Sequence, residues 1–181
     1  VLLDGIGFSA IGRLHLLKLL QKQAREEGID VRFERPVVDL AEFPDADIIV
    51  GADGVSSLVR GSDETAFGTS LSYLTNRFAW FGTTEIFDTL SQTFLDTPNG
   101  PINAHHYRFS KTMSTFLVEC NERTFFASGF DRMSEDETQA ALERIFVNTL
   151  NGKPLISNRS IWRQFPIVHN ERWFAGNKVI L

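Results

Sequence analysis

The segment from Asp47 to Gly54 constrains the fold of this chain more than any other part of it. It reads Asp-Ile-Ile-Val-Gly-Ala-Asp-Gly. Three consecutive β-branched residues, Ile48, Ile49 and Val50, predict a strand that is buried on both faces, as in parallel sheets covered by helices. The Gly-Ala-Asp-Gly run predicts a tight turn at the carboxyl end of this strand, which is where open α/β sheets bind ligands.

A helix and a strand are expected before this segment. Apolar residues recur at helical spacing over residues 11–27, between Ser9 as the expected cap and Gly28 as a left-handed stop. Residues 29–34 alternate strictly between apolar and polar, which predicts a strand with one buried face. Residues 1–62 are therefore expected to form part of an α/β unit.

The sequence pattern changes after residue 62. Short aromatic or β-branched runs lie at residues 77–84, 92–95, 103–109 and 114–120, and a strong turn signal, Thr-Pro-Asn-Gly, occupies 97–100. These runs predict an antiparallel meander. The expected fold class is thus α/β (α+β): a partial Rossmann-like unit plus an antiparallel sheet with a helix.

The helix of this second part has a clear start. Ser134 and Glu137 form a potential capping box, and apolar residues follow at helical spacing up to Leu150. Two further strands are expected over 160–168 and 177–181.

Composition excludes several classes of protein. Apolar residues make up 43% of the 181, enough for a packed core, so intrinsic disorder is excluded. The net charge of −5 gives no basic surface for nucleic acid. No run approaches the about 20 apolar residues that a membrane-spanning helix needs. The single Cys120 can form neither an internal disulfide nor a cysteine-based zinc site, so the cytoplasm is the default location.

Phenylalanine is unusually frequent. Sixteen Phe stand against two Tyr, and most of them lie between Phe78 and Phe174. The bias suggests an aromatic-walled core or pocket, with ordinary packing as the simpler interpretation.

Three residues of the 51–60 segment carry chemistry. Gly54 permits close approach of a ligand to the backbone, Asp53 can accept hydrogen bonds from hydroxyls or water, and Arg60 can neutralise a phosphate. An ordinary strand-to-helix turn with a solvated arginine explains the same residues. The chemistry of the segment alone leaves both interpretations open.

The whole ten-residue string, Gly-Ala-Asp-Gly-Val-Ser-Ser-Leu-Val-Arg, resembles the Asp-Gly fingerprint of the flavin-dependent aromatic hydroxylases, the group that includes para-hydroxybenzoate hydroxylase. Residues 7–21 are similar to the Arg-bearing helix of that family. The resemblance implies that Arg13, Asp53, Gly54 and Arg60 bind FAD, and that the enzyme uses NAD(P)H and O2 to hydroxylate an aromatic ring. Since the flavin carries the chemistry, no catalytic side chain is expected.

The resemblance also implies a domain division. Residues 1–62 correspond to a partial FAD/NAD(P)-binding domain, 63–172 to the substrate-binding domain, and 173–181 to a strand that returns to the FAD domain. The family's Gly-x-Gly-x-x-Gly and Gly-Asp flavin motifs are both missing from the sequence. We therefore expect a central fragment of a longer enzyme.

A narrower branch of the family is similar in three further segments, at residues 77–83, 104–109 and 113–120. That branch contains hydroxylases of salicylyl-CoA and 2-aminobenzoyl-CoA and a violacein-pathway hydroxylase. The resemblance implies a small aromatic substrate, either an aryl-CoA thioester or a tryptophan-derived ring.

Candidate substrate-binding residues follow from strand alternation. His106 and Arg108 share one face of a strand that resembles the family's substrate-facing strand, so we expect both to contact the substrate, with a merely exposed face as the alternative. Trp80, Trp162 and Phe165 are candidate walls of the same pocket, although core packing is the better interpretation of Trp80.

Other functions are less well supported. His105 and His106 are adjacent, so their side chains point to opposite faces and cannot chelate one metal ion. Ser9 lies in a Gly-x-Ser string whose second Gly comes one residue too late for a nucleophile elbow. The main rival is a non-catalytic module that binds an aromatic or acyl-CoA ligand, and a hydrolase is a weaker third possibility.

Overall fold

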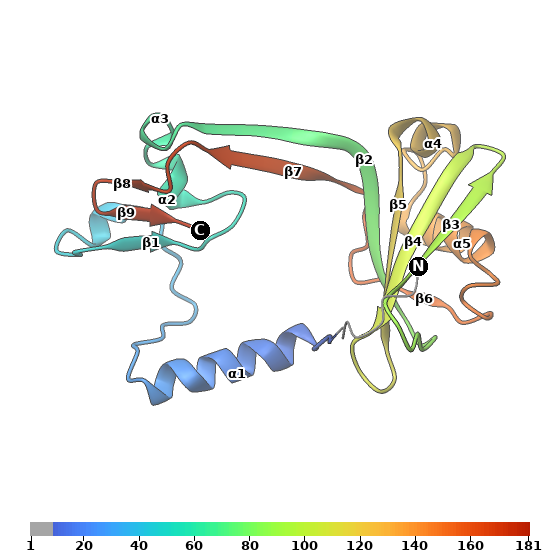
Figure 1. Cartoon of the computed structure of the whole chain (residues 1–181), viewed down its shortest axis with the longest axis horizontal. Helices are drawn as coiled ribbons and strands as arrows, with labels where there is room; N and C mark the ends of the chain where they lie inside the picture. Colours follow the sequence, from blue (N-terminus) through green and yellow to red (C-terminus); the bar gives the residue numbers. More distant parts are fainter. Residues whose placement is uncertain (1–8) are drawn as a thin grey trace. The chain divides into compact units, whose positions relative to one another are not determined.

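The computed structural model describes residues 9–181, which form two compact units (Figure 1). The sheet unit combines the described residues up to Ile29 with Thr75–Phe165, and the loop unit combines Asp30–Leu74 with Pro166–Leu181. Each unit is therefore built from two separate stretches of the chain. Among the helices of residues 9–181, none combines the length and the apolar content that crossing a bilayer requires.

Helix α1 (Arg13–Glu26) forms where the apolar periodicity predicted a helix. The expected cap at Ser9 is wrong: the N-cap is Gly12, and no side chain caps the helix. Ser9 lies three residues too early for its hydroxyl to reach the first-turn N–H groups. Gly28, with φ at 74°, follows the helix as expected. Gly7 and Phe8, which belong to the segment similar to the family's helix, lie outside the described residues.

The strand expected over residues 29–34 is also wrong. These residues form no strand, and Ile29 and Phe33 are exposed. Alternation can stabilise a strand only when a neighbouring strand accepts its backbone hydrogen bonds and a core covers its apolar face. Within residues 9–181 no strand pairs with this segment.

The loop unit holds a small sheet with the order β1-β9-β8. Strand β1 (Ile49–Gly51) is parallel to β9 (Lys178–Ile180), which confirms the parallel pairing expected of this segment, and β8 (Phe174–Ala175) is antiparallel to β9. Three short helices complete the unit: η1 (Leu40–Glu42), α2 (Leu58–Gly61) and α3 (Glu64–Phe67). Its core consists of Val59, Phe67 and Ile180.

Burial of the first strand on both faces is not observed. Ile48 and Val50 are exposed, whereas Ile49 packs against the core of the loop unit. The core of the loop unit covers the face of β1 that carries Ile49, and the face that carries Ile48 and Val50 is left exposed.

The sheet unit contains the expected antiparallel meander, with the order β3-β4-β5-β2-β6 and with β7 paired to β2. The strands of this sheet are β2 (Thr69–Thr83), β3 (Ser91–Thr97), β4 (Gly100–Arg108), β5 (Ser114–Cys120), β6 (Leu155–Ile156) and β7 (Arg163–Asn170). Residues 69–74 of β2 and 166–170 of β7 belong to the loop unit. The turn between β3 and β4 falls at residues 97–100, where the sequence predicted it.

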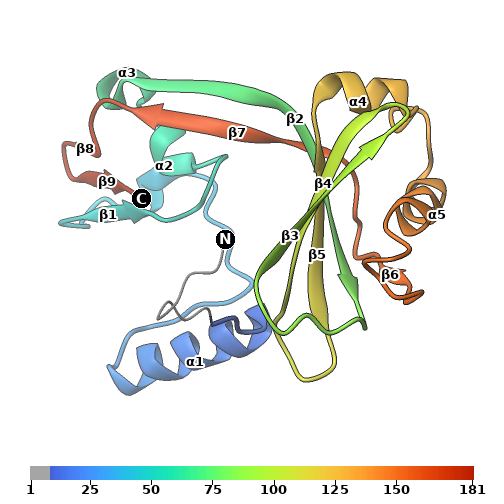
Figure 2. The ribbon, with the colours of Figure 1, turned by 45° about the vertical axis from the view of Figure 1, so that its right-hand side comes forward.

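Helices α4 (Glu122–Ala127) and α5 (Glu135–Ile145) lie beside the same face of the meander (Figure 2). The core between them and the sheet is rich in phenylalanine and includes Phe81, Phe116, Phe125, Phe130 and Phe146. Much of the phenylalanine excess is therefore ordinary core packing.

The capping box at the start of α5 is present as predicted. The N–H of Glu137 donates to Ser134 Oγ at 3.2 Å, and the N–H of Ser134 donates to Glu137 Oε2 at 2.8 Å. Two amide groups that would otherwise lack partners are thus satisfied.

We expect Ser134→Ala to lower the free energy of unfolding by about 1 kcal/mol, because the Glu137 N–H loses its acceptor. Urea unfolding followed by circular dichroism measures the change. Ser72→Ala, at an exposed strand position, is the matched control. An equal loss in both variants would contradict a role for the cap.

Candidate functional site

The loop between β1 and α2 is the first candidate site, and it carries Asp53, Gly54 and Arg60. Asp53 Oδ2 accepts a hydrogen bond from the N–H of Leu58 at 2.6 Å, so the carboxylate closes the loop onto the start of α2. Partial burial acts to raise the pKa of Asp53, but hydrogen bonds from Ser57 and from the Leu58 N–H outweigh it, and the pKa lies below its usual value. Asp53 is therefore ionised at neutral pH.

Arg60 is folded back onto this loop. Its Nη1 donates to the Gly54 carbonyl at 3.3 Å, and its Nη2 donates to the Val55 carbonyl. The guanidinium thus holds the loop closed, and its positive charge lies at the turn that follows β1. The three residues that the sequence singled out are brought together.

Two glycines of the loop are required by its geometry. A Cβ at Gly51 would lie 2.6 Å from the Cβ of Val59, so the residue must be glycine for strand and helix to pack this closely. Gly54 has φ at +80°, a conformation that other residues rarely adopt, and no atom lies within 4 Å of where its Cβ would be. The backbone at Gly54 is therefore open to the approach of a ligand.

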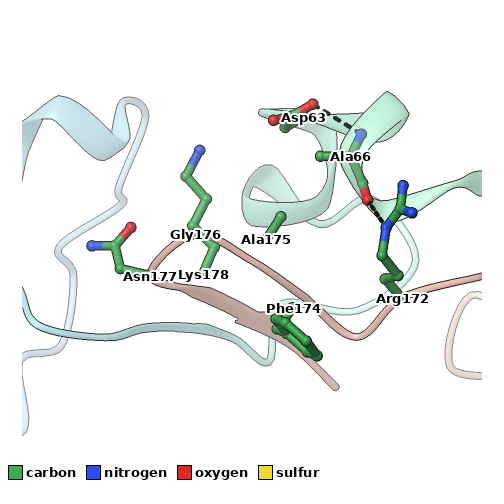
Figure 3. A pocket seen from close by; sticks show the side chains of 8 residues that line it. All are labelled: Asp63, Ala66, Arg172, Phe174, Ala175, Gly176, Asn177 and Lys178. Carbon is green, nitrogen blue, oxygen red and sulfur yellow. Dashed lines mark hydrogen bonds between the residues drawn. The ribbon is translucent and has the colours of Figure 1, made fainter.

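A second feature of the loop unit is a cavity of about 450 Å³ (Figure 3). Arg172 on its wall donates from Nε to the Ala66 carbonyl at 2.5 Å, and Lys178 donates from Nζ to Ser62 Oγ at 3.0 Å. Both cations are therefore engaged with the protein. None of the residues predicted from the sequence lines this cavity.

Arg13 is the first residue of α1 and is exposed. It belongs to the sheet unit, whereas the Asp53 loop belongs to the loop unit. Within residues 9–181, no three His, Cys, Asp or Glu side chains converge as a metal site would require.

The second candidate site is the face of the meander opposite the helices, which we call the open face. Paired residues of neighbouring strands point to the same side of a sheet, so the register assigns every side chain to one face. Two rows of residues cross the open face. The first row is Phe94, Asn103, Glu119 and Phe78, and the second is Gln92, His105, Leu117 and Trp80.

Polar side chains occupy the centre of the open face. Asn76 Nδ2 donates to Glu119 Oε1 at 2.8 Å, and Gln92 Nε2 donates to Asn103 Oδ1 at 3.2 Å. His105 Nε2 lies 3.8 Å from Glu119 Oε2. An ionisable pair thus stands at the middle of the sheet.

Aromatic side chains flank this polar centre. Phe165 of β7 stacks on Phe78 with ring centroids 3.8 Å apart. Trp80 is 54% exposed and Phe94 is 70% exposed. Core packing, the interpretation preferred for Trp80 from the sequence, is therefore wrong, because the register turns this residue away from the helices.

The other two predicted substrate residues lie elsewhere. His106 is buried on the helix-covered face, stacked against Phe116 and hydrogen bonded to Thr93 Oγ1 at 2.9 Å. Arg108 is exposed at the end of β4, with Nη1 3.4 Å from Asp88. The structure therefore does not bring these two together with Trp80 and Phe165. A substrate contact for His106 or Arg108 stays a prediction, and the geometry favours packing for His106.

Sequence reasoning missed His105 and Glu119. The signal that could have found His105 is the apolar pattern of β4, in which Ile102 and Ala104 share the side of His106. An apolar side faces the core, so His105 belongs to the opposite side. Glu119 lies on β5 and joins this face only through the pairing of β5 with β4. Trp162, a candidate pocket wall from the sequence, lies on the core side like His106, where it packs against Phe125 and Phe130.

Several known proteins are similar in sequence to nearly the whole of this chain. The salicyloyl-CoA 5-hydroxylase of a Streptomyces species is 37% identical over 98% of this chain and 36% of its own length. The protodeoxyviolaceinate monooxygenase of Chromobacterium violaceum is 32% identical over 98% of this chain and 48% of its own length. A 3-hydroxy-4-methyl-anthranilyl-[aryl-carrier protein] 5-monooxygenase of Streptosporangium sibiricum is 36% identical, over 95% and 44%. No protein-family model matches the chain.

Solved structures with the same fold include 2-methyl-3-hydroxypyridine-5-carboxylic acid oxygenase, with a TM-score of 0.67, 15% identity and coverage of 94% of this chain and 50% of that one. Aklavinone-11 hydroxylase, solved with FAD and aklavinone, matches with a TM-score of 0.58, 19% identity and coverage of 94% and 35%. At these identities the likeness concerns the fold alone.

The chain is therefore a homologue of aromatic hydroxylases and monooxygenases, and it has the fold of the corresponding part of FAD-dependent hydroxylases. Among these homologues are a salicyloyl-CoA hydroxylase and a violacein-pathway monooxygenase, the branch that the sequence resembled. The chain spans about half or less of the length of the curated relatives that it matches.

Burial of His106 makes the stability of the protein depend on pH. Burial, together with the nearby His105, lowers the pKa of His106 from 6.5 to about 4. Between these values the unfolded chain binds a proton that the folded chain does not, so stability is complete above pH 6.5 and falls as the pH is lowered toward 4.

We expect the free energy of unfolding of the wild-type protein to drop by about 2 kcal/mol from this group between pH 7 and pH 5. His106→Gln should remove this part of the drop, whereas His169→Gln, at an exposed position, should not. Urea unfolding at the two pH values measures both. The same pH dependence in wild type and His106→Gln would contradict the assignment.

Proposed function

We propose that this chain is part of an FAD-dependent monooxygenase that hydroxylates a small aromatic substrate with NAD(P)H and O2. The observation that carries the proposal is the combination of the Asp53 loop with an open, aromatic-flanked sheet face in a chain whose homologues are aromatic hydroxylases. The substrate class proposed is an aryl-CoA thioester, as in the name of the salicyloyl-CoA relative, or a tryptophan-derived ring, as the resemblance to the violacein-pathway branch implies.

The residues of the Asp53 loop fit a flavin nucleotide. The space beside Gly54 is open, and the Arg60 guanidinium places a positive charge next to the exposed loop backbone. Backbone N–H groups and an arginine are the groups that hold a phosphate in proteins. Arg13, exposed at the start of α1, is proposed as a further FAD contact. When bound, FAD would supply the activation of oxygen that amino-acid side chains cannot provide.

The open face is proposed to hold the aromatic ring. Trp80 and the stacked pair of Phe78 and Phe165 offer apolar surface for ring packing. The polar centre would fix the orientation of the ring, and the apolar flanks would exclude water from it. These side chains bind and orient the substrate, and none acts as a covalent catalyst.

Two finer points belong to the same proposal. We propose NAD(P)H as the reductant, because hydroxylation by O2 needs two electrons from outside the ring. A cytoplasmic location is proposed from the single cysteine, Cys120, which is free and buried and indicates no oxidising compartment.

In the natural polypeptide, meaning the whole protein that the gene encodes, Arg60→Ala should weaken FAD binding about tenfold or more. Both the positive charge and the closure of the loop are lost in this variant. Titration of the deflavinated protein with FAD, followed by quenching of flavin fluorescence, measures the dissociation constant. Arg144→Ala, at an exposed position of α5, is the matched control and should leave it unchanged.

Two results would contradict the proposal. Equal FAD affinity in wild type and Arg60→Ala would show that the Asp53 loop is not part of the flavin-binding site. A colourless natural polypeptide that binds an aromatic ligand but no flavin would instead support a non-catalytic binding module.

A further inference from the structure

The open face has the layout of a specificity site for a ring with a polar substituent. From Phe94 to Phe78 the first row crosses three strand spacings, about 14 Å, which is enough for a single or fused aromatic ring. Asn103 and Glu119 lie between these two aromatic ends. A ring placed over the rows therefore has apolar contacts at its edges and hydrogen-bonding groups beneath it.

His105 is held in this centre by a chain of contacts. Glu119 Oε1 accepts the hydrogen bond from Asn76, which fixes the carboxylate, and Glu119 Oε2 faces His105 Nε2 at 3.8 Å. That ring nitrogen is buried and has no hydrogen-bond partner among residues 9–181, although the His105 side chain as a whole is 38% exposed. Part of the imidazole therefore points outward while Nε2 faces the carboxylate.

The carboxylate determines the chemistry of the imidazole. An N–H on Nε2 is favoured by the negative charge of Glu119, which leaves Nδ1 as a hydrogen-bond acceptor in the neutral ring. An acceptor of this kind binds a ring hydroxyl or a ring N–H. The names of two relatives denote rings that carry a hydroxyl, the salicyloyl and the 3-hydroxy-4-methyl-anthranilyl groups.

We propose that His105, positioned by Glu119, accepts a hydrogen bond from a hydroxyl or N–H substituent of the aromatic substrate and thereby selects rings that carry such a donor. The proposal rests on the proposed function, since it concerns the ring that the open face would hold. His105 is the specificity-determining residue, and Glu119 is a positioning residue that acts through it.

The test uses a pair of ligands that differ only in the donor: salicyloyl-CoA and benzoyl-CoA, which lacks the ring hydroxyl. Calorimetric titration of the natural polypeptide gives both dissociation constants. We expect His105→Phe to weaken salicyloyl-CoA binding about tenfold, with less than about a twofold change for benzoyl-CoA. His105→Gln keeps an acceptor and should recover most of the selectivity.

Two more variants separate positioning from packing. Glu119→Gln should reduce the preference for salicyloyl-CoA by a smaller factor, about threefold, because the histidine remains but its orientation is no longer fixed. His169→Gln is the histidine control and should change neither constant. Thermal unfolding of each variant shows that the fold is retained.

Each outcome supports or overturns the inference. Equal losses for the two ligands, or no loss in His105→Phe, overturn it while leaving the proposed function intact. A wild-type protein that binds flavin but neither ligand overturns the proposed ring-hydroxyl substrate and the inference with it. A protein that binds no flavin contradicts the proposed function itself.

Discussion

The pairing of β5 with β2 on one side and with β4 on the other determines most of what this chain can do. In an antiparallel sheet, residues that are paired across neighbouring strands point to the same face of the sheet. The pairs that β5 forms with β2 and β4 therefore divide the side chains into two sets, one for each face. One set, with Phe81 and Phe116, packs under α4 and α5. The other carries His105 and Glu119. A shift by one residue would exchange the two sets and bury the polar centre.

The sequence predicted those elements whose causes are local. The capping box at Ser134, the turn at 97–100 and the antiparallel runs depend on neighbouring residues, and all are present. Features that depend on distant partners were missed. The segment from Ile29 to Glu34 alternates like a strand, but no strand pairs with it within residues 9–181. His106 was assigned to the substrate face, although it shares its side of β4 with Ile102 and Ala104, which pack in the core.

The two candidate sites differ in how well the sequence revealed them. The Asp53 loop is a continuous string of residues, so its glycines, acid and arginine stand together in the sequence itself. The open face is assembled from four strands and from β7, and Phe165 reaches Phe78 only after the chain has folded. A site of that kind depends on the strand register, which is why Glu119 was not among the predicted residues.

The most direct test of the central claim is the origin of the oxygen atom in the product. The natural polypeptide, supplied with FAD, NADPH and isotopically labelled O2, should convert an aromatic CoA thioester such as salicyloyl-CoA or anthraniloyl-CoA into a ring-hydroxylated product that contains one labelled oxygen atom. Mass spectrometry of the product measures the label. A flavin-loaded protein that hydroxylates neither an aryl-CoA thioester nor a tryptophan-derived ring, or a product whose oxygen comes from water, would contradict the account.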